Sequence, residues 1–110
     1  MNTSSTLPRR LAMHSLVAIE EAGKYANLEI DAVLRRHTLS SADSALYTRL
    51  VYGVTEKRIT LDFVIDTYAR ETKAAGMDPY VRTALRLGIY QLAFCDRIPA
   101  HAAVSETVEL

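Results

Sequence analysis

Few side chains in this 110-residue sequence have the type and spacing that catalysis requires. The single cysteine, Cys95, is expected at the C-terminal end of a helix and next to Asp96, where the electrostatic field disfavours a thiolate. His14, His37 and His101 are far apart and have no metal-ligand spacing. Four isolated glycines cannot form a glycine-rich phosphate loop. The sequence therefore predicts a packed thiol, and no catalytic residue, cofactor-binding residue or metal ligand in this chain.

Pairs of basic residues are better candidates for function. Arg35-Arg36 and Lys57-Arg58 are expected to close helices, where the helix dipole favours cations by about 0.3–1 kcal/mol. Arg9-Arg10 instead opens the first expected helix, where the dipole disfavours cations. A phosphate backbone is a good reason for two arginines there, and a merely solvated surface is the alternative. From the residues alone, Arg9 and Arg10 are therefore candidates for contact with phosphate groups.

Composition limits the classes of protein that remain. Lys and Arg together number 13, as do Asp and Glu, so the net charge is zero. This excludes a highly basic protein that coats nucleic acid, but not a local basic patch. Hydrophobic residues are 49% of the chain and charged residues 24%, which is typical of a folded domain. With neither a secretory signal nor an apolar run of about 18 residues, we expect a cytoplasmic protein without a membrane partner.

The spacing of apolar residues predicts one all-α domain of about six helices. The expected helices span about residues 8–22, 28–36, 42–57, 61–72 and 79–94, and a sixth opens at Pro99. Ser40 or Ser41 is expected to cap the third helix and Asp78 the fifth, while Gly23 and Gly76 are expected to end helices. The fifth helix carries an apolar stripe of Val81, Leu85, Ile89 and Leu92.

Glycines and tyrosines inside the expected helices predict packing. Gly53 and Gly88 each cost about 1 kcal/mol relative to alanine in a helix interior, and close approach of two helices is the usual compensation. Tyr52, Tyr68 and Tyr90 are expected to pack against neighbours with their hydroxyl groups at the rim, rather than to stack on bases.

The ends of the chain suggest a domain boundary at each side. Residues 1–7 are expected to form a flexible N-terminus and residues 8–110 the folded domain. The sixth helical pattern stops at Glu109-Leu110 without a cap, so we expect the chain to be a piece of a longer protein. An apolar surface around Val104 and Val108 would then seek a partner, which predicts that the piece can form a homodimer.

Two segments make the sequence resemble the NusB family. The pattern Arg9-x-x-Ala12-x-x-x-Leu16 resembles the opening helix of that family. The run LRLGIYQL at 85–92, followed by IPAHAAVSETVEL at 98–110, resembles its most characteristic stretch. The resemblance covers about residues 8–110 and implies the NusB-like antitermination-factor helical bundle as the fold, with RNA as a partner.

Three further segments favour one branch of that family. YANLEID at 25–31, LVYGV at 50–54 and IPAHA at 98–102 look like the NusB-like N-terminal domain of 16S rRNA (cytosine-5) methyltransferases, the Sun or Fmu family. That resemblance implies an accessory domain, not itself an enzyme, that helps to hold 16S rRNA for a downstream catalytic domain. Under it, the predicted RNA-binding residues are Arg9 and Arg10, with His14 one helical turn further along. S-adenosylmethionine would be the cofactor of that missing domain. Cys95 follows Phe94 and so does not match the Pro-Cys pair of its catalytic half.

Two other interpretations remain open. One is a stand-alone NusB-type transcription antitermination factor, which the family resemblance would pair with boxA RNA and ribosomal protein S10. Ser105 and Thr107 depart from the Asn and Ala common in the family, and the N-terminus has fewer basic residues than that factor usually has. The other is a structural module that only packs against the rest of its own chain.

Overall fold

The computed structural model describes residues 3–95, with side chains from Thr6 onward. Five α-helices make up this part: α1 (Thr3–Ala22), α2 (Ala26–Arg36), α3 (Ser41–Glu56), α4 (Arg58–Tyr68) and α5 (Pro79–Phe94), with a short 3-10 helix η1 (Ala74–Gly76) before α5. No strand occurs between residues 3 and 95. The all-α prediction is therefore confirmed, while the sixth helix expected from Pro99 lies outside the described residues.

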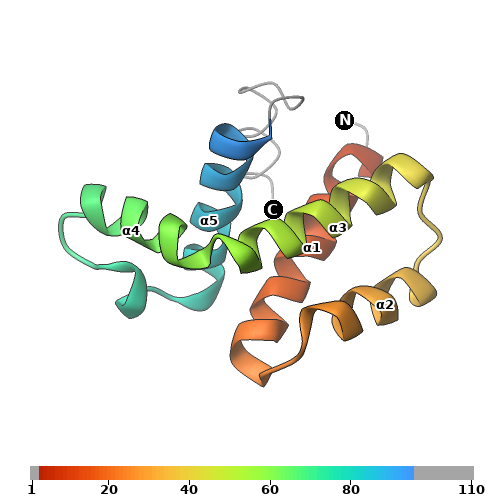
Figure 1. The fold of residues 1–110 in the computed structure, drawn as a ribbon, viewed down its shortest axis with the longest axis horizontal. Coiled ribbons are helices and arrows are strands. Elements are labelled where there is room, and N and C mark those ends of the chain that lie inside the picture. The colour runs from red at the N-terminus through yellow and green to blue at the C-terminus, as the bar shows by residue number, and fades with distance from the viewer. Residues whose placement is uncertain (1–2, 96–110) are drawn as a thin grey trace.

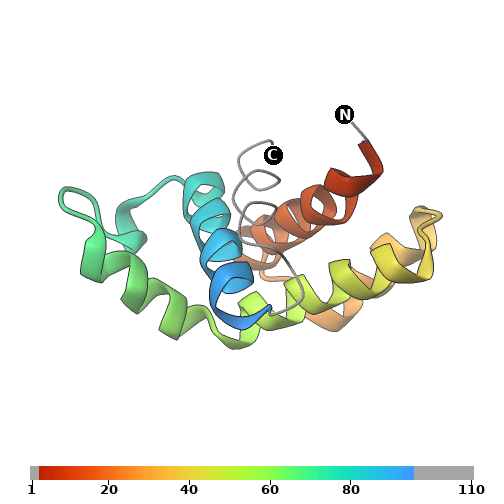
Figure 2. The ribbon, with the colours of Figure 1, turned by 90° about the horizontal axis from the view of Figure 1, so that it is seen from above.

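The helices pack around α1 and α3, which cross at the centre of the molecule. Helices α3 and α4 follow one another along the long axis of the molecule (Figures 1 and 2). Helix α2 lies near one end of this axis and η1 near the other, and α5 lies in the middle. The core consists mainly of apolar side chains from α1 and α3, with two or so from each of the other α-helices, and Ala12, Leu50, Val51 and Leu87 are fully buried in it. Full burial of a leucine or valine side chain contributes about 1.5–3 kcal/mol.

Three of the expected helix boundaries are confirmed by capping contacts. The Ser40 hydroxyl accepts a hydrogen bond from the backbone N–H of Asp43 at 3.1 Å. Gly23 follows α1 with φ of 66°, a left-handed conformation that favours glycine. The Asp78 carboxylate accepts from the backbone N–H of Tyr80 at 3.0 Å, directly before Pro79. The Ser40 and Asp78 caps therefore fix where α3 and α5 begin, and Gly23 lets the chain turn away after α1.

Helix α1 begins earlier than the sequence predicts. We expected it to open at Pro8, but it begins at Thr3 and contains Pro8 in its second turn. A proline there removes one helical hydrogen bond. Thr6 and Pro8 are both buried, so packing offsets this loss and explains why the proline is tolerated inside the helix. The flexibility expected of residues 1–7 stays a prediction, although Thr3–Leu7 belong to the helix.

The boundary between α3 and α4 also differs from the prediction. Helix α4 begins at Arg58, not near residue 61, so Lys57 is both the C-cap of α3 and the N-cap of α4. Helix α4 ends at Tyr68, four residues before the expected Thr72. The chain turns back there because the Asp66 carboxylate accepts from the backbone N–H of Ala74 at 2.7 Å.

The close approach expected at Gly53 is confirmed. A Cβ atom at this position of α3 would overlap the ring and hydroxyl of Tyr90 on α5, so glycine lets the two helices meet. Tyr90 is 7% exposed and packs as predicted, whereas the prediction is wrong for Tyr68, which is 81% exposed. Tyr52 is partly exposed at 44%. The role expected of Gly88 stays a prediction.

Most of the apolar stripe of α5 is exposed, and only Ile89 of its four residues packs against the core. Val81 and Leu92 are more than half exposed. The side chains that α5 buries are largely polar and include Arg82, Arg86 and Gln91. This register cannot be derived from hydrophobic spacing, because it depends on carboxylates supplied by other helices.

Candidate nucleic-acid interface

The three predicted RNA-binding residues all lie on α1, but they do not share one environment. Arg9 is 6% exposed, and its Nε donates a hydrogen bond to the Gln91 side-chain oxygen on α5 at 2.7 Å. This contact ties α1 to α5 and accounts for a cation near the start of the helix. RNA contact by Arg9 stays a prediction, and the burial of its side chain argues against it.

Arg10 and His14 point away from the core. Both side chains are exposed, and their spacing of four residues places them on one face of α1. The His14 ring meets the Tyr80 ring of α5 edge to face, with 6.3 Å between the ring centroids and 78° between the planes. Tyr80 is 50% exposed. Arg10, His14 and Tyr80 therefore form one exposed surface of mixed cationic and aromatic character, here called the α1–α5 surface.

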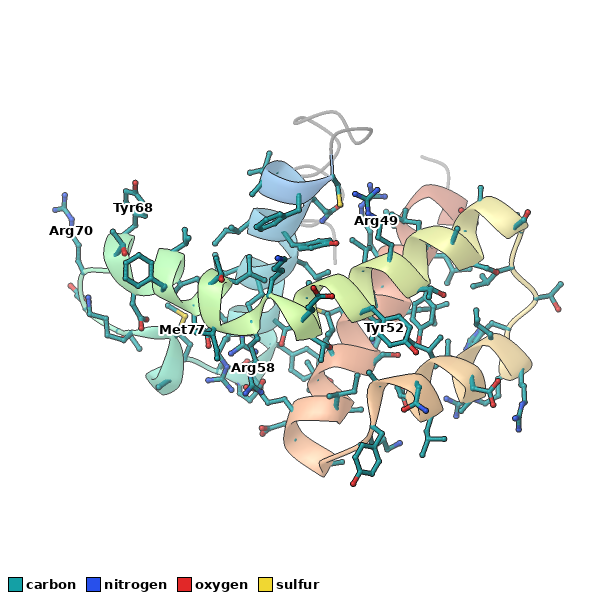
Figure 3. The ribbon with its side chains drawn as sticks, viewed as in Figure 1. Arg49, Tyr52, Arg58, Tyr68, Arg70 and Met77 are labelled. Atoms are coloured by element: carbon teal, nitrogen blue, oxygen red, sulfur yellow. The ribbon has the colours of Figure 1, made fainter. Side chains whose placement is uncertain are left out.

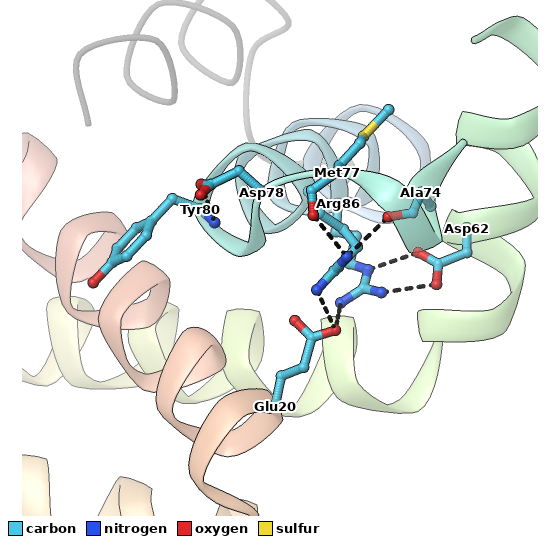
Figure 4. Close-up of polar contacts among 8 residues, drawn as sticks. Glu20, Asp62, Ala74, Met77, Asp78, Tyr80 and Arg86 are labelled. Atoms are coloured by element: carbon cyan, nitrogen blue, oxygen red, sulfur yellow. Dashed lines mark hydrogen bonds and ion pairs between the residues drawn. The ribbon is translucent and has the colours of Figure 1, made fainter. Parts of the chain in front are cut away.

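Tyr80 is the residue of this surface that the sequence analysis missed. The reasoning from sequence treated tyrosines as packing residues and did not single out Tyr80. A usable signal was its position directly after the Asp78-Pro79 cap, because a side chain in the first turn of a helix often lies at the edge of a domain. Figure 4 shows Tyr80 extending from the start of α5 toward α1.

An ionic cluster of two buried arginines and two partly exposed carboxylates holds α5 against α1 and α4 (Figure 4). The Glu20 carboxylate of α1 lies 3.0 Å from the Arg82 guanidinium and 3.4 Å from that of Arg86. Arg82 also donates through Nη1 to the backbone carbonyls of Ala74 and Met77, at 2.9 and 3.0 Å. Because Glu20 contacts two arginines of α5, it fixes the position of that helix along α1.

Arg86 has the strongest single pairing in the cluster. Its Nε and Nη2 donate to the two carboxylate oxygens of Asp62 on α4, at 2.6 and 2.8 Å. Burial alone would lower the pKa of Arg86, but the hydrogen bonds and charge of Asp62 and the charge of Glu20 raise it above its ordinary value. Arg86 is therefore permanently charged, and Asp62 is the partner that makes its burial tolerable.

Several other cations have structural partners. Arg49 donates to the backbone carbonyl of Phe94 at 2.8 Å, and the Lys57 ammonium lies 5.4 Å from the centre of the Phe94 ring. Both cations are placed at the C-terminal end of α5, which the helix dipole favours. Arg35 pairs with Asp31 on the exposed face of α2, as expected for a cation in the last turn. Arg70 lies at the far end of α4, away from α1 (Figure 3).

A second surface feature is an apolar groove between α4 and α5. It is lined by Val64, Ile65, Tyr68 and Ala69 from α4, and by Met77, Leu85 and Ile89 from α5 and the segment before it. No charged side chain lines it. An uncharged groove cannot attract phosphate, so it is suited to contact with protein rather than with a nucleic-acid backbone.

Residues 3–95 offer little else that could do chemistry. No group of three or more His, Cys, Asp or Glu side chains in this part is placed to hold a metal ion. Cys95 is 3% exposed and ends α5, which confirms the prediction of a packed thiol. Within the same residues, no helix combines the length and the apolar character needed to cross a membrane.

The comparisons with known proteins place the chain in a family. The model of the NusB family matches residues 6–110, so the chain belongs to the NusB family, as its resemblance predicted. It is 33% identical to the probable ribosomal RNA small subunit methyltransferase B of Bacillus subtilis, over 96% of this chain and 23% of that protein. It is 36% identical to the ribosomal RNA small subunit methyltransferase B of Thermus thermophilus, over 93% of this chain and 24% of that protein.

A second group of relatives consists of transcription antitermination proteins. The chain is 31% identical to the transcription antitermination protein NusB of Bacillus velezensis, over 93% of this chain and 75% of that protein. No solved structure matches the chain. The chain thus spans about a quarter of the methyltransferase relatives and three quarters of this antitermination relative.

Proposed function

We propose that this chain is an RNA-binding accessory domain of a ribosomal small-subunit RNA (cytosine-5) methyltransferase. It helps to hold 16S rRNA in the cytoplasm while a catalytic domain in the same protein, which binds S-adenosylmethionine, methylates the base. The observation that carries this proposal is the pattern of relatives. The methyltransferase relatives match more than 90% of this chain, yet the chain spans only about a quarter of their length.

The α1–α5 surface is where we expect the RNA to bind. Arg10 is exposed on a helix whose other nearby cation, Arg9, is already bound to Gln91. A guanidinium that is free to turn toward solvent can make two parallel hydrogen bonds to a phosphate group. His14 lies four residues further along the same face and supplies a ring that can donate hydrogen bonds or stack. Arg10 therefore positions the RNA backbone, and His14 contacts the adjoining nucleotide.

The salt dependence of binding tests this assignment. The affinity of the chain for a single-stranded 16S rRNA fragment is measured at several salt concentrations, for the natural chain and for Arg10→Ala. Loss of one phosphate contact lowers the slope of log affinity against log salt by about 0.7 for single-stranded RNA. Arg70→Ala is the matched control, because Arg70 is exposed at the far end of α4. An unchanged slope in Arg10→Ala, or an equal change in Arg70→Ala, contradicts the assignment.

A second candidate is a stand-alone antitermination factor that binds boxA RNA and ribosomal protein S10. The coverage of 75% of the Bacillus velezensis relative supports it, and the apolar groove between α4 and α5 offers a surface for a protein. Under the first proposal, the rest of the same polypeptide is the partner for that groove. Co-elution with S10 in size-exclusion chromatography, together with tighter binding to boxA than to the 16S fragment, would favour the antitermination factor.

A further inference from the structure

We propose that Tyr80, with His14 packed edge to face against it, forms a stacking platform for one unpaired base of single-stranded RNA, beside a phosphate held by Arg10. This inference rests on the proposed RNA-binding function and adds a residue and a ligand chemistry to it. It predicts that the chain recognises a strand with at least one base turned out of its stack, rather than a continuous duplex.

The contact between the two rings leaves room for a base. Because His14 and Tyr80 meet edge to face with 78° between their planes, His14 covers at most one face of the Tyr80 ring. The half-exposed Tyr80 contrasts with Tyr47 and Tyr90, which are at most 7% exposed and serve the core. Base stacking on an exposed aromatic ring is tolerant of sequence, because every base has a π-face.

The platform is held in place before any ligand arrives. The backbone N–H of Tyr80 is fixed by the Asp78 carboxylate at 3.0 Å. Helix α5, which carries Tyr80, is tied to α1 by Arg9 and Gln91 at 2.7 Å and by Arg82 and Glu20 at 3.0 Å. A ring that is already positioned loses little conformational entropy on binding, which favours affinity.

The charges around the platform set the orientation of a nucleotide on it. The Asp78 carboxylate lies next to the Tyr80 backbone and repels phosphate, whereas Arg10, one helical turn from His14 on α1, attracts it. A nucleotide therefore binds with its phosphate toward Arg10 and its base toward Tyr80. The same arrangement disfavours an isolated phosphate ion at Tyr80.

The test uses a short single-stranded RNA that carries one 2-aminopurine, a base whose fluorescence is quenched by stacking. Replacement of an aromatic residue that stacks on a base weakens binding about 5- to 100-fold. We expect Tyr80→Leu to show such a loss together with recovered fluorescence, and Tyr80→Phe to bind and quench as the natural chain does. Tyr68→Leu, which removes an exposed tyrosine from α4, should change neither signal.

The salt slope separates this inference from the proposed function. Stacking carries no charge, so Tyr80→Leu should keep the natural slope while Arg10→Ala reduces it. Natural affinity and quenching in Tyr80→Leu, with the Arg10→Ala effect intact, overturn the platform alone. A natural chain that binds no RNA overturns both proposals. His14→Ala, at an exposed position of α1, serves as a second test if Tyr80→Leu lowers the melting temperature, and unchanged quenching in it also counts against the platform.

Discussion

Removal of the Asp62 carboxylate is the perturbation with the largest effect that the structure predicts. The Arg86 side chain is 7% exposed and donates two hydrogen bonds to the Asp62 carboxylate, at 2.6 and 2.8 Å. In Asp62→Ala both acceptors disappear, while the guanidinium stays buried and charged. Among the described residues, the carboxylate that still pairs with Arg86 is that of Glu20, at 3.4 Å, which Arg82 already shares.

The magnitude follows from the burial of the two partners. Breaking a fully buried ion pair costs about 3–5 kcal/mol, since it leaves a charge without a partner. Asp62 is 28% exposed, so water can reach part of the space that its carboxylate leaves, and Glu20 keeps some of the interaction. We therefore expect a loss of about 2–3 kcal/mol in the free energy of unfolding. For a domain of this size this corresponds to a decrease of about 10–20 °C in melting temperature.

Urea unfolding of the natural chain, Asp62→Ala and Asp31→Ala measures this loss. Asp31 is the matched control, because it also pairs with an arginine, Arg35, but at exposed positions on α2. Exposed pairs of this kind contribute about 0–0.5 kcal/mol. If Asp62→Ala destabilises the chain by no more than Asp31→Ala does, the buried cluster does not hold α5 in place and the reasoning fails.

Three further predictions concern packing, titration and capping. Gly53→Ala should destabilise the chain by about 1–3 kcal/mol in thermal unfolding, despite the better helix propensity of alanine, because its Cβ overlaps Tyr90; a gain in stability would contradict the close approach. Burial raises the pKa of Tyr47, so the unfolded state loses its proton first and stability falls as pH rises above about 10. Tyr47→Phe should reduce this loss of stability at alkaline pH. An identical dependence of stability on pH in the variant and the natural chain would contradict the prediction. Asp78→Ala should lower the free energy of unfolding by about 1 kcal/mol, because the N-cap of α5 is lost. An unchanged free energy of unfolding in chemical denaturation would contradict this.

Local signals in the sequence predicted the presence of the five described α-helices and several of their ends. Ser40, Asp78 and Gly23 act through their own backbone neighbours, so their roles follow from residue type and position. The packing role of Gly53 could also be predicted, because the cost of a glycine in a helix interior has to be offset by close packing. The start of α1 was misplaced because Pro8 favours a first turn locally, and only the burial of Thr6 and Pro8 in the folded chain shows why the helix extends past it.

The polar interior of α5 could not be predicted from the sequence. Arg82 and Arg86 look like surface residues between the apolar positions of the helix, and they become buried because Glu20 and Asp62 approach from α1 and α4. Separations of 24 residues or more along the chain leave no spacing to recognise. The contact of Arg9 with Gln91 could not be predicted for the same reason, since the two residues are 82 positions apart.

Only part of the candidate site could be predicted from the sequence. Arg10 and His14 share a helical face by simple periodicity, and the structure places both at the surface. Tyr80 joins them only through the packing of α5 on α1. The family could be recognised from ordered motifs, and the match over residues 6–110 confirms it, whereas the choice between a methyltransferase domain and an antitermination factor depends on partners outside this chain.

Mapping of the RNA contact by NMR tests the central claim most directly. The chain is labelled with 15N and titrated with a single-stranded 16S rRNA fragment while the backbone amide shifts are followed. The account predicts that the largest changes lie on the α1–α5 surface, around Arg10, His14 and Tyr80, with little change at Tyr68 and Arg70. Changes centred on the groove between α4 and α5, or no changes at all, would contradict it.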